Sequence, residues 1–366
     1  PNGDWYNYEN KQWANAQTED GSIWVWVPRY SYKILYKDTN GNTIGYSDSD
    51  GITDINGNIV TGTKKQGAVE VKGSVDGKQI EKYVLHPAFQ KFATDELTMA
   101  NGGWKEELSG IWVAKFEASK SNATASSEGS GSTIKIQPGV RSWSSIRVTA
   151  IFDNCKNYNS ALNSHMMKNS EWGCVAYLSR SIYGINGEIW INPNSSYVTG
   201  QAGNSVDASR TTTTNSYTTT NGQKASTTGN VYGIYDMSGG LYEYVASYAD
   251  NGYDSLTNYG ESLVNSSSGY LKQVYSKGKD FDKEETYQAN KERYGDAVYE
   301  TSTKIGISQY DNSWYGDTAL FPYENSPFFN RGENYNSGSA AGVFAFSSGT
   351  GNASSGGGGF RPVLAP

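Results

Sequence analysis

Alternating apolar and polar positions dominate the first part of the chain and predict β-strands. Segment 23–34, IWVWVPRYSYKI, contains two alternating stretches separated by Pro28, and proline in a strand occurs at edges or bulges. Segments 82–89 and 110–118 predict two further strands. Asn-Gly and Asp-Gly pairs within 38–62 predict hairpins, because both central positions of such turns need a positive φ.

A helical period replaces this alternation further along the chain. Four side chains at i, i+3, i+4 and i+7 predict a first helix, with Ser144 or Ser145 as its N-cap: Val148, Ile151, Phe152 and Cys155. The same spacing predicts a second helix that begins near Asn169 or Ser170: Trp172, Val175, Ala176 and Ser179. We expect each helix to bury one stripe of side chains against the same sheet.

Three other regions are less regular. Acidic residues precede basic ones in 282–294, as a helix dipole favours, so this segment gives a weaker helix prediction. Segments 119–132 and 199–229 are polar without an apolar period and predict loops. From residue 322 onward we expect short strands and turns rich in Gly, Asn and Ser.

Segment 229–244, GNVYGIYDMSGGLYEY, is the most informative stretch. Gly233, Gly239 and Gly240 interrupt any 3.6-residue stripe, so an amphipathic helix is excluded there. The segment predicts strand, turn and strand, with backbone carbonyls left free at the turn and Glu243 placed between two tyrosines.

Composition indicates a folded, loop-rich and β-rich protein. Only 36% of the 366 residues are hydrophobic, but 28 Tyr and 10 Trp supply the apolar area that Leu and Ile usually provide. The net charge is −7 and no basic cluster occurs, so we expect no nucleic-acid partner. No run of 18 apolar residues occurs, so we expect no membrane contact by this segment. Because a strand-like pattern begins directly after Pro1, we expect a longer N-terminus to precede it.

Two cysteines, Cys155 and Cys174, are too few for a disulfide scaffold. Two alternatives remain: a single disulfide between them, or two buried free thiols. The two histidines, His86 and His165, are expected to be structural or surface residues, because their spacing matches no metal-binding or catalytic motif.

Six segments, taken in order, resemble landmarks of the formylglycine-generating-enzyme family: 110–119 (GIWVAKFEAS), 141–158 (RSWSSIRVTAIFDNCKNY), 168–179 (KNSEWGCVAYLS), 230–244 (NVYGIYDMSGGLYEY), 328–335 (FFNRGENY) and 358–363 (GGFRPV). We call these segments the landmarks. The resemblance implies an α+β, C-type-lectin-like fold, loop-rich, with small twisted antiparallel sheets flanked by two helices. Residues 110–366 would form this domain, and the β-rich hairpins of 1–109 would be integral to it.

The resemblance does not extend to the family's chemistry. Its oxidase members hold copper with two cysteines just after the fifth landmark, where residues 330–349 of this chain contain none. Its iron-dependent relatives need an H-x-x-x-H-x-E ligand set, which this chain lacks. We therefore expect no copper, no iron and no enzyme, with a cryptic enzyme as a minor alternative.

A calcium site is the cofactor that the resemblance leaves open. Carried over from the family, its ligands would be the carbonyls of Ser238, Gly239 and Leu241 and the side chain of Glu243, which suit a hard cation. Gly240 stands where the family has Asn. In the alternative, Glu243 accepts backbone hydrogen bonds across the turn. The remaining charged landmark residues, Arg331 and Arg361, are expected to form buried structural pairs.

The favoured function is a non-catalytic binding or adhesion module at the surface of a bacterium or a virion. Its partner would be a surface ligand, either a glycan or a protein. Aromatic residues near the C-terminus are the expected recognition face, because Tyr and Trp bind with little loss of conformational entropy: Tyr310, Trp314, Tyr315, Tyr323, Phe328, Phe329 and Tyr335. The alternative is a structural subunit that self-associates into a pilus-like filament or a phage tail fibre.

Overall fold

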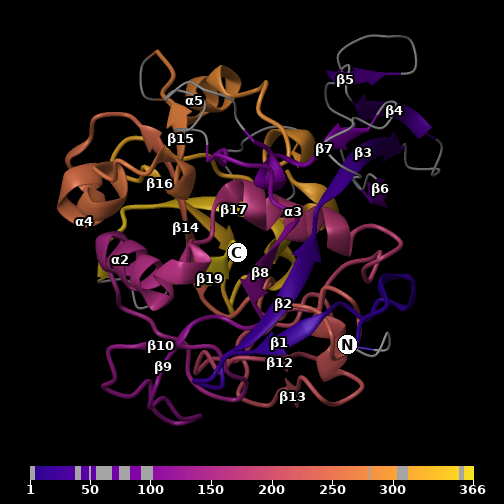
Figure 1. Ribbon diagram of the computed structural model, residues 1–366, viewed down its shortest axis with the longest axis vertical. Coiled ribbons are helices and arrows are strands. Elements are labelled where there is room, and N and C mark those ends of the chain that lie inside the picture. Colours follow the sequence, from indigo (N-terminus) through magenta and orange to yellow (C-terminus); the bar gives the residue numbers. More distant parts are fainter. Residues whose placement is uncertain are drawn as a thin grey trace.

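The computed structural model describes residues 5–37, 43–48, 51–54, 68–73, 83–91, 102–279, 282–302, 312–353 and 358–366. Over these residues the protein is an α+β structure of helices, small and mainly antiparallel sheets and long loops (Figure 1). The coarse fold class expected from the sequence is confirmed. None of the described helices has both the length and the apolar character needed to cross a bilayer.

Two five-stranded sheets contain most of the landmark segments. The first has the order β1 (Asn15–Gln17), β2 (Ile23–Pro28), β8 (Gly110–Ala114), β19 (Pro362–Leu364) and β11 (His165–Met166), with every pair antiparallel. The second has the order β15 (Gln273–Ser276), β14 (Tyr242–Asp250), β16 (Phe328–Gly332) and β17 (Gly342–Gly349). The short strand β18 (Gly358–Gly359) also pairs with β14, and β14 runs parallel to both β15 and β18.

A third sheet and two small hairpins complete the strands. The third sheet has the order β5 (Gly51–Asp54), β4 (Thr43–Asp48), β3 (Tyr30–Lys37) and β6 (Ala68–Gly73), and β7 (Val84–Leu85) also pairs with β3. The hairpins are β9 (Ser119–Lys120) with β10 (Ile134–Lys135), and β12 (Gln201–Ala202) with β13 (Asn215–Ser216).

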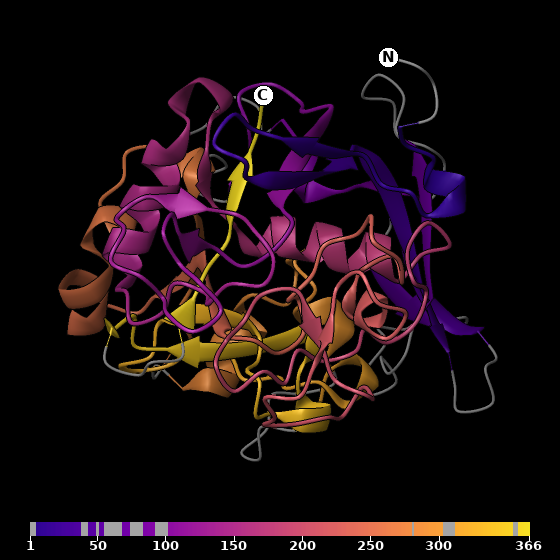
Figure 2. The same ribbon diagram turned by 90° about the horizontal axis from the view of Figure 1, so that it is seen from below.

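The described α-helices are α2 (Val148–Tyr158), α3 (Asn169–Ser179), α4 (Asp254–Val264) and α5 (Lys283–Ala289). Figure 2 shows α3 between the indigo N-terminal strands and the yellow C-terminal strands. Strands of two sheets, β6 in one and β14 and β17 in the other, contact it. Helices α2 and α4 pack on each other at the side of the molecule, where Ser262 Oγ donates to Asp153 (2.7 Å).

The helix predictions are confirmed in position but not in every detail. Helix α2 buries the four predicted side chains, yet Arg147 stands at its N-cap without a capping hydrogen bond, so the predicted serine cap is wrong. Helix α3 begins at the predicted Asn169, but all its residues are buried, not one stripe, because strands of two sheets cover it. Helix α5 is capped by Asp282 and is shorter than predicted. Helix α4 is missing from the predictions, although Leu256, Tyr259 and Leu263 follow a helical spacing.

The strand predictions also differ in detail from the structure. Pro28 ends β2 as expected, and β3 then enters another sheet. After β7, His86 caps a short 3-10 helix, so the predicted strand at 82–89 is largely wrong. The first half of 229–244 consists of turns, and strand begins only at Tyr242. Strands β3, β4 and β5 pair antiparallel in succession, whereas the predicted turn residues between them lie outside the described residues.

Gly173 on α3 has no room for a side chain, because an added Cβ would lie 2.1 Å from the carbonyl oxygen of Gly295. We expect Gly173→Ala to lower the free energy of unfolding by about 1–3 kcal/mol, since the backbone must shift. In the control Gly187→Ala the nearest atom lies 3.9 Å away, so a change below about 0.5 kcal/mol is expected. Denaturant unfolding measures both variants. Equal stabilities would contradict the close approach of α3 to Gly295.

Candidate functional site

A buried guanidinium lies where the landmarks meet. Arg361, between β18 and β19, is 1% exposed. It donates to both carboxylate oxygens of Glu243 on β14, with Nε 2.8 Å from Oε2. It also donates to the carbonyls of Ala114 (2.8 Å) and Tyr235 (3.0 Å). Because a buried charge is costly unless it is paired, these contacts fix the end of the chain against both β8 and β14.

Glu117, from the first landmark, is a second buried carboxylate near this pair. Its Oε1 accepts from the N–H of Leu241 (2.8 Å), and its Oε2 accepts from the hydroxyl of Ser142. Burial raises the pKa of Glu117 well above its usual range, and the charge of Glu243 adds to the rise. An added Cβ at Gly240, where φ is +73°, would lie 2.4 Å from Oε1 of Glu117. The positive φ, together with this contact, therefore favours glycine at position 240.

Trp172 on α3 connects two guanidinium groups. Its ring centroid lies 5.5 Å from the guanidinium carbon of Arg331 and 5.9 Å from that of Arg361, within the range of cation–π attraction. Arg331 donates to the carbonyls of Ala345 (2.9 Å) and Asp296 (2.8 Å). The predicted buried pair is thus confirmed for Arg361. For Arg331 the burial is confirmed, but the hydrogen-bond partners that the structure gives it are neutral oxygens.

Six buried residues, one from each landmark, form a group that we call the landmark centre: Glu117, Ser142, Trp172, Glu243, Arg331 and Arg361. Around it the predicted calcium ligands occupy the turn before β14. The Ser238 carbonyl accepts from the N–H of Asn192 (2.8 Å), and Glu243 is bound to Arg361. The described residues contain no cluster of three or more His, Cys, Asp and Glu placed to hold a metal. Calcium binding at Ser238, Gly239, Leu241 and Glu243 stays a prediction.

Both histidines are buried, so the surface alternative is wrong and their burial is consistent with a structural role. His165 Nε2 lies 2.8 Å from Glu171 Oε1, and Lys168 also contacts this carboxylate. Burial opposes the charge of Glu171, but His165 and Lys168 outweigh it and lower its pKa to about 2. Burial lowers the pKa of His86 to about 3, so this ring is neutral.

Glu300 is a buried carboxyl that no sequence pattern indicated. It accepts hydrogen bonds from the phenol groups of Tyr177 (2.8 Å) and Tyr32 (3.0 Å) and from the N–H of Gly295 (2.5 Å). Burial raises its pKa to about 7 in spite of these donors. It follows the irregular stretch before residue 300, where neither a strand nor a helix period marks an inward side chain.

The two cysteines are free and buried, so the free-thiol alternative is confirmed and the disulfide alternative is wrong. Cys155 belongs to one hydrophobic cluster and Cys174 to the other. Burial raises the pKa of both thiols well above the usual range, which keeps them protonated at neutral pH.

The predicted aromatic face is wrong at three of its seven positions. Trp314, Phe328 and Phe329 are 0% exposed and belong to the core, because β16 and its neighbours are covered on both faces. Tyr315, Tyr323 and Tyr335 are half-buried, and Tyr310 lies outside the described residues. The exposed aromatic side chains of the described residues lie in other segments: Trp5, Tyr6, Tyr232, Tyr253 and Tyr294.

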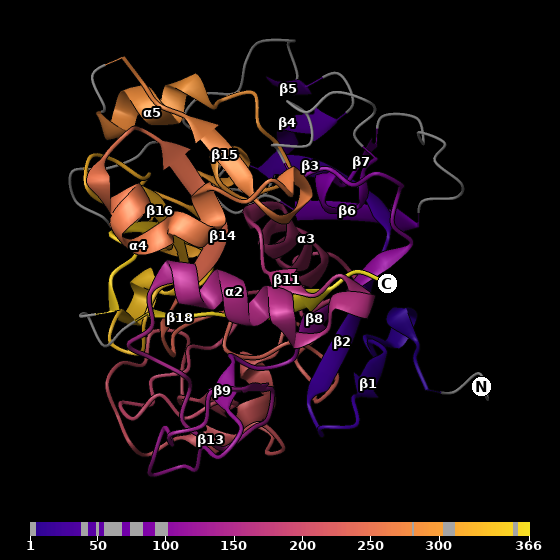
Figure 3. The same cartoon turned by 60° about the vertical axis from the view of Figure 1, so that its left-hand side comes forward.

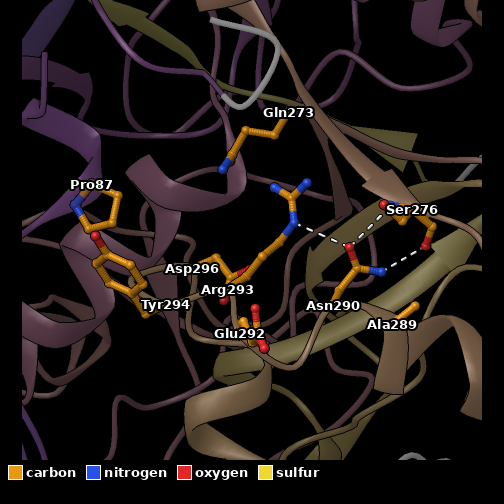
Figure 4. Close-up of a pocket in the computed structure, with 9 residues that line it drawn as sticks. All are labelled: Pro87, Gln273, Ser276, Ala289, Asn290, Glu292, Arg293, Tyr294 and Asp296. Atoms are coloured by element: carbon orange, nitrogen blue, oxygen red, sulfur yellow. Dashed lines mark hydrogen bonds between the residues drawn. The ribbon is translucent and has the colours of Figure 1, made fainter. Parts of the chain in front are cut away.

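One hollow of about 330 Å³ lies between Pro87 and the end of α5 (Figure 4). Polar side chains in its wall bind one another. Arg293 Nε donates to Asn290 Oδ1 (3.2 Å), and the Asn290 amide donates to the Ser276 carbonyl (2.7 Å). The guanidinium of Arg293 lies over the ring of Tyr275, 4.1 Å from its centroid. The Arg293 and Asn290 side chains are therefore committed to the fold.

No protein-family model matches this sequence, and no curated protein matches it either. The resemblance to the formylglycine-generating-enzyme family therefore stays a prediction.

Replacing Glu243 tests the landmark centre. Glu243→Gln removes the charge of the carboxylate that is hydrogen-bonded to the buried guanidinium of Arg361, and we expect the free energy of unfolding to fall by about 3 kcal/mol. Glu261→Gln, at an exposed position of α4, is the matched control and should change it by less than about 0.5 kcal/mol. A loss below 1 kcal/mol (about the worth of a surface pair) for Glu243→Gln would show that the ion pair does not hold the fold.

The wild type and Glu243→Gln also test whether calcium binds. Because Arg361 already binds Glu243, we expect the Tm of the wild type to be equal in EDTA and in calcium chloride. A calcium-dependent rise in Tm that Glu243→Gln loses would instead establish the site that the resemblance implies.

Glu300 generates a pH prediction. Its folded pKa of about 7 lies above the unfolded value, so its contribution to stability is complete below the unfolded pKa and is lost as the pH rises through 7. Between pH 5 and pH 8 we expect the wild type to lose on the order of 2–3 kcal/mol more unfolding free energy than Glu300→Gln. Denaturant titrations at both pH values measure the difference. Parallel pH profiles for the two proteins would contradict the proposed burial of a neutral carboxyl.

Proposed function

We propose that this chain is a non-catalytic binding or adhesion module of an extracellular surface, built on a formylglycine-generating-enzyme-like scaffold with a C-type-lectin-like fold. The landmark centre supports the scaffold, because hydrogen bonds and cation–π contacts join residues of all six landmarks. Segments that resemble one family in their order along the chain thus also meet in space, as parts of one fold do.

The main observation in support of a binding function is that the landmark centre is closed to solvent. Its charged side chains are 0–1% exposed and are bonded to one another or to neighbouring backbone and side-chain groups, so they hold strands together. On such a scaffold, contacts with partners are made by surface loops. The proposed partner is a glycan or a protein, and the proposed location is a bacterial cell surface or a virion.

Paired glycan and protein arrays test this function, together with a broad panel of hydrolytic and redox substrates assayed with and without metal ions. We expect binding on at least one array, loss of that binding after heat denaturation, and no turnover. Turnover, or the absence of binding on both arrays, would contradict the proposal. Light scattering of the same sample addresses the filament alternative, since a monodisperse monomer is expected and large polymers would favour a structural subunit.

A further inference from the structure

A polar groove opens between the β9–β10 hairpin, the last turns of α2 and the turn that leads into β2; Figure 3 shows α2 and β9 on this side. Its volume is about 450 Å³, within the range of small-ligand sites. Eight of the nine side chains that line it are polar. Those that matter for recognition come from all three parts: Asp20, Thr133, Lys135, Asn154, Asn157 and Tyr158.

The floor of this groove is held in place before any ligand binds. The ring of Tyr158 packs on buried Trp24, with centroids 5.3 Å apart, and its hydroxyl lies 3.2 Å from the carboxylate of Asp20. Asp20 also accepts from the hydroxyl of Thr18 (2.6 Å) and the N–H of Ser22 (3.0 Å). Burial opposes the charge of Asp20, but these hydrogen bonds outweigh it and lower its pKa. The aromatic face and the carboxylate are therefore preorganised.

The rim of the groove keeps unused hydrogen-bonding capacity. The Asn154 amide donates to the Ala150 carbonyl (2.8 Å), which leaves its side-chain oxygen available. The structure gives the side chains of Asn157, Lys135 and Thr133 no hydrogen-bond partner among the described residues. This distinguishes the groove from the hollow beside α5, whose polar groups bind one another.

The charges of the groove select the class of ligand. An anion would meet the carboxylate of Asp20, and a cation would meet the ammonium group of Lys135, so a neutral ligand fits best. The side chains at the rim offer both donors and acceptors, which suits hydroxyl groups because a hydroxyl both donates and accepts. We propose that this groove binds a neutral saccharide, with one sugar ring against Tyr158 and its hydroxyls bonded to Asn154, Asn157 and Lys135. The inference rests on the proposed binding function and names its site and ligand class.

A printed array of neutral oligosaccharides and their sialylated counterparts, read beside the protein array, tests the inference. We expect the wild type to bind neutral members and the double variant Asn154→Ala/Asn157→Ala to bind them about tenfold more weakly, since each lost hydrogen bond weakens binding roughly two- to tenfold. Both residues lie on the open side of α2, where alanine favours helix, so folding should be retained. Tyr158→Phe keeps the ring and should keep most of the binding. Asn336→Ala, at an exposed position outside the groove, is the control.

The outcomes separate the inference from the proposed function. Equal glycan binding by the wild type and the double variant would overturn the groove as the site while leaving a binding module. Binding only to sialylated glycans, or only to the protein array, would overturn the neutral saccharide and again leave the binding function. If the wild type binds neither array, both proposals fall together.

Discussion

The closing segment 358–363 joins the first and second sheets, and one buried ion pair holds the junction. Strand β18 pairs with β14 in one sheet, and β19 pairs with β8 and β11 in the other. Arg361 lies between them and bonds Glu243 in one sheet and Ala114 in the other. Two apolar side chains in place of the ion pair could fill the same volume and give equal or better stability. They would not, however, need hydrogen bonds of about 2.8 Å to both sheets. We infer that the pair specifies how the sheets meet more than it stabilises them.

Helix α3 can begin inside the protein because tertiary partners bind the N–H groups of its first, polar residues. The first backbone N–H groups of a helix have no partner inside it. Here the N–H of Asn169 donates to the hydroxyl of Ser247 on β14 (3.0 Å), and the N–H of Ser170 donates to the side chain of Gln273 on β15 (2.8 Å). The start of α3 is thus bound to the same sheet that holds Glu243, and Trp172 one turn further reaches both arginines. The ion pair and the helix therefore depend on each other for their positions.

The sequence predicted those features in which local pattern and tertiary burial agree. Helix α2 has one buried face, so its four apolar side chains marked it correctly. Helix α4 has a comparable stripe, with Leu256, Tyr259 and Leu263 at i, i+3 and i+7, and only Gly260 within it disfavours a helix, so the sequence signal for α4 was present but was not used. Three residues of the predicted aromatic face are wrong because aromatic content does not distinguish a contact surface from a core, and Trp314, Phe328 and Phe329 pack inward. Glu300 could not be found, since nothing local shows that a glutamate in an irregular stretch faces two tyrosines.

The polar groove and the landmark centre are linked by one strand register. Trp24, on which Tyr158 packs, is the cross-strand partner of Ala114, and the carbonyl of Ala114 accepts from Arg361. A shift of β2 against β8 by one residue would turn Trp24 to the opposite face of the sheet. It would thereby remove the support of the Tyr158 ring. The landmark centre and the floor of the groove are therefore built on the same pair of strands, β2 and β8. Ligand specificity can then change at Asn154, Asn157 and Lys135 without disturbing the charges that hold the sheets together.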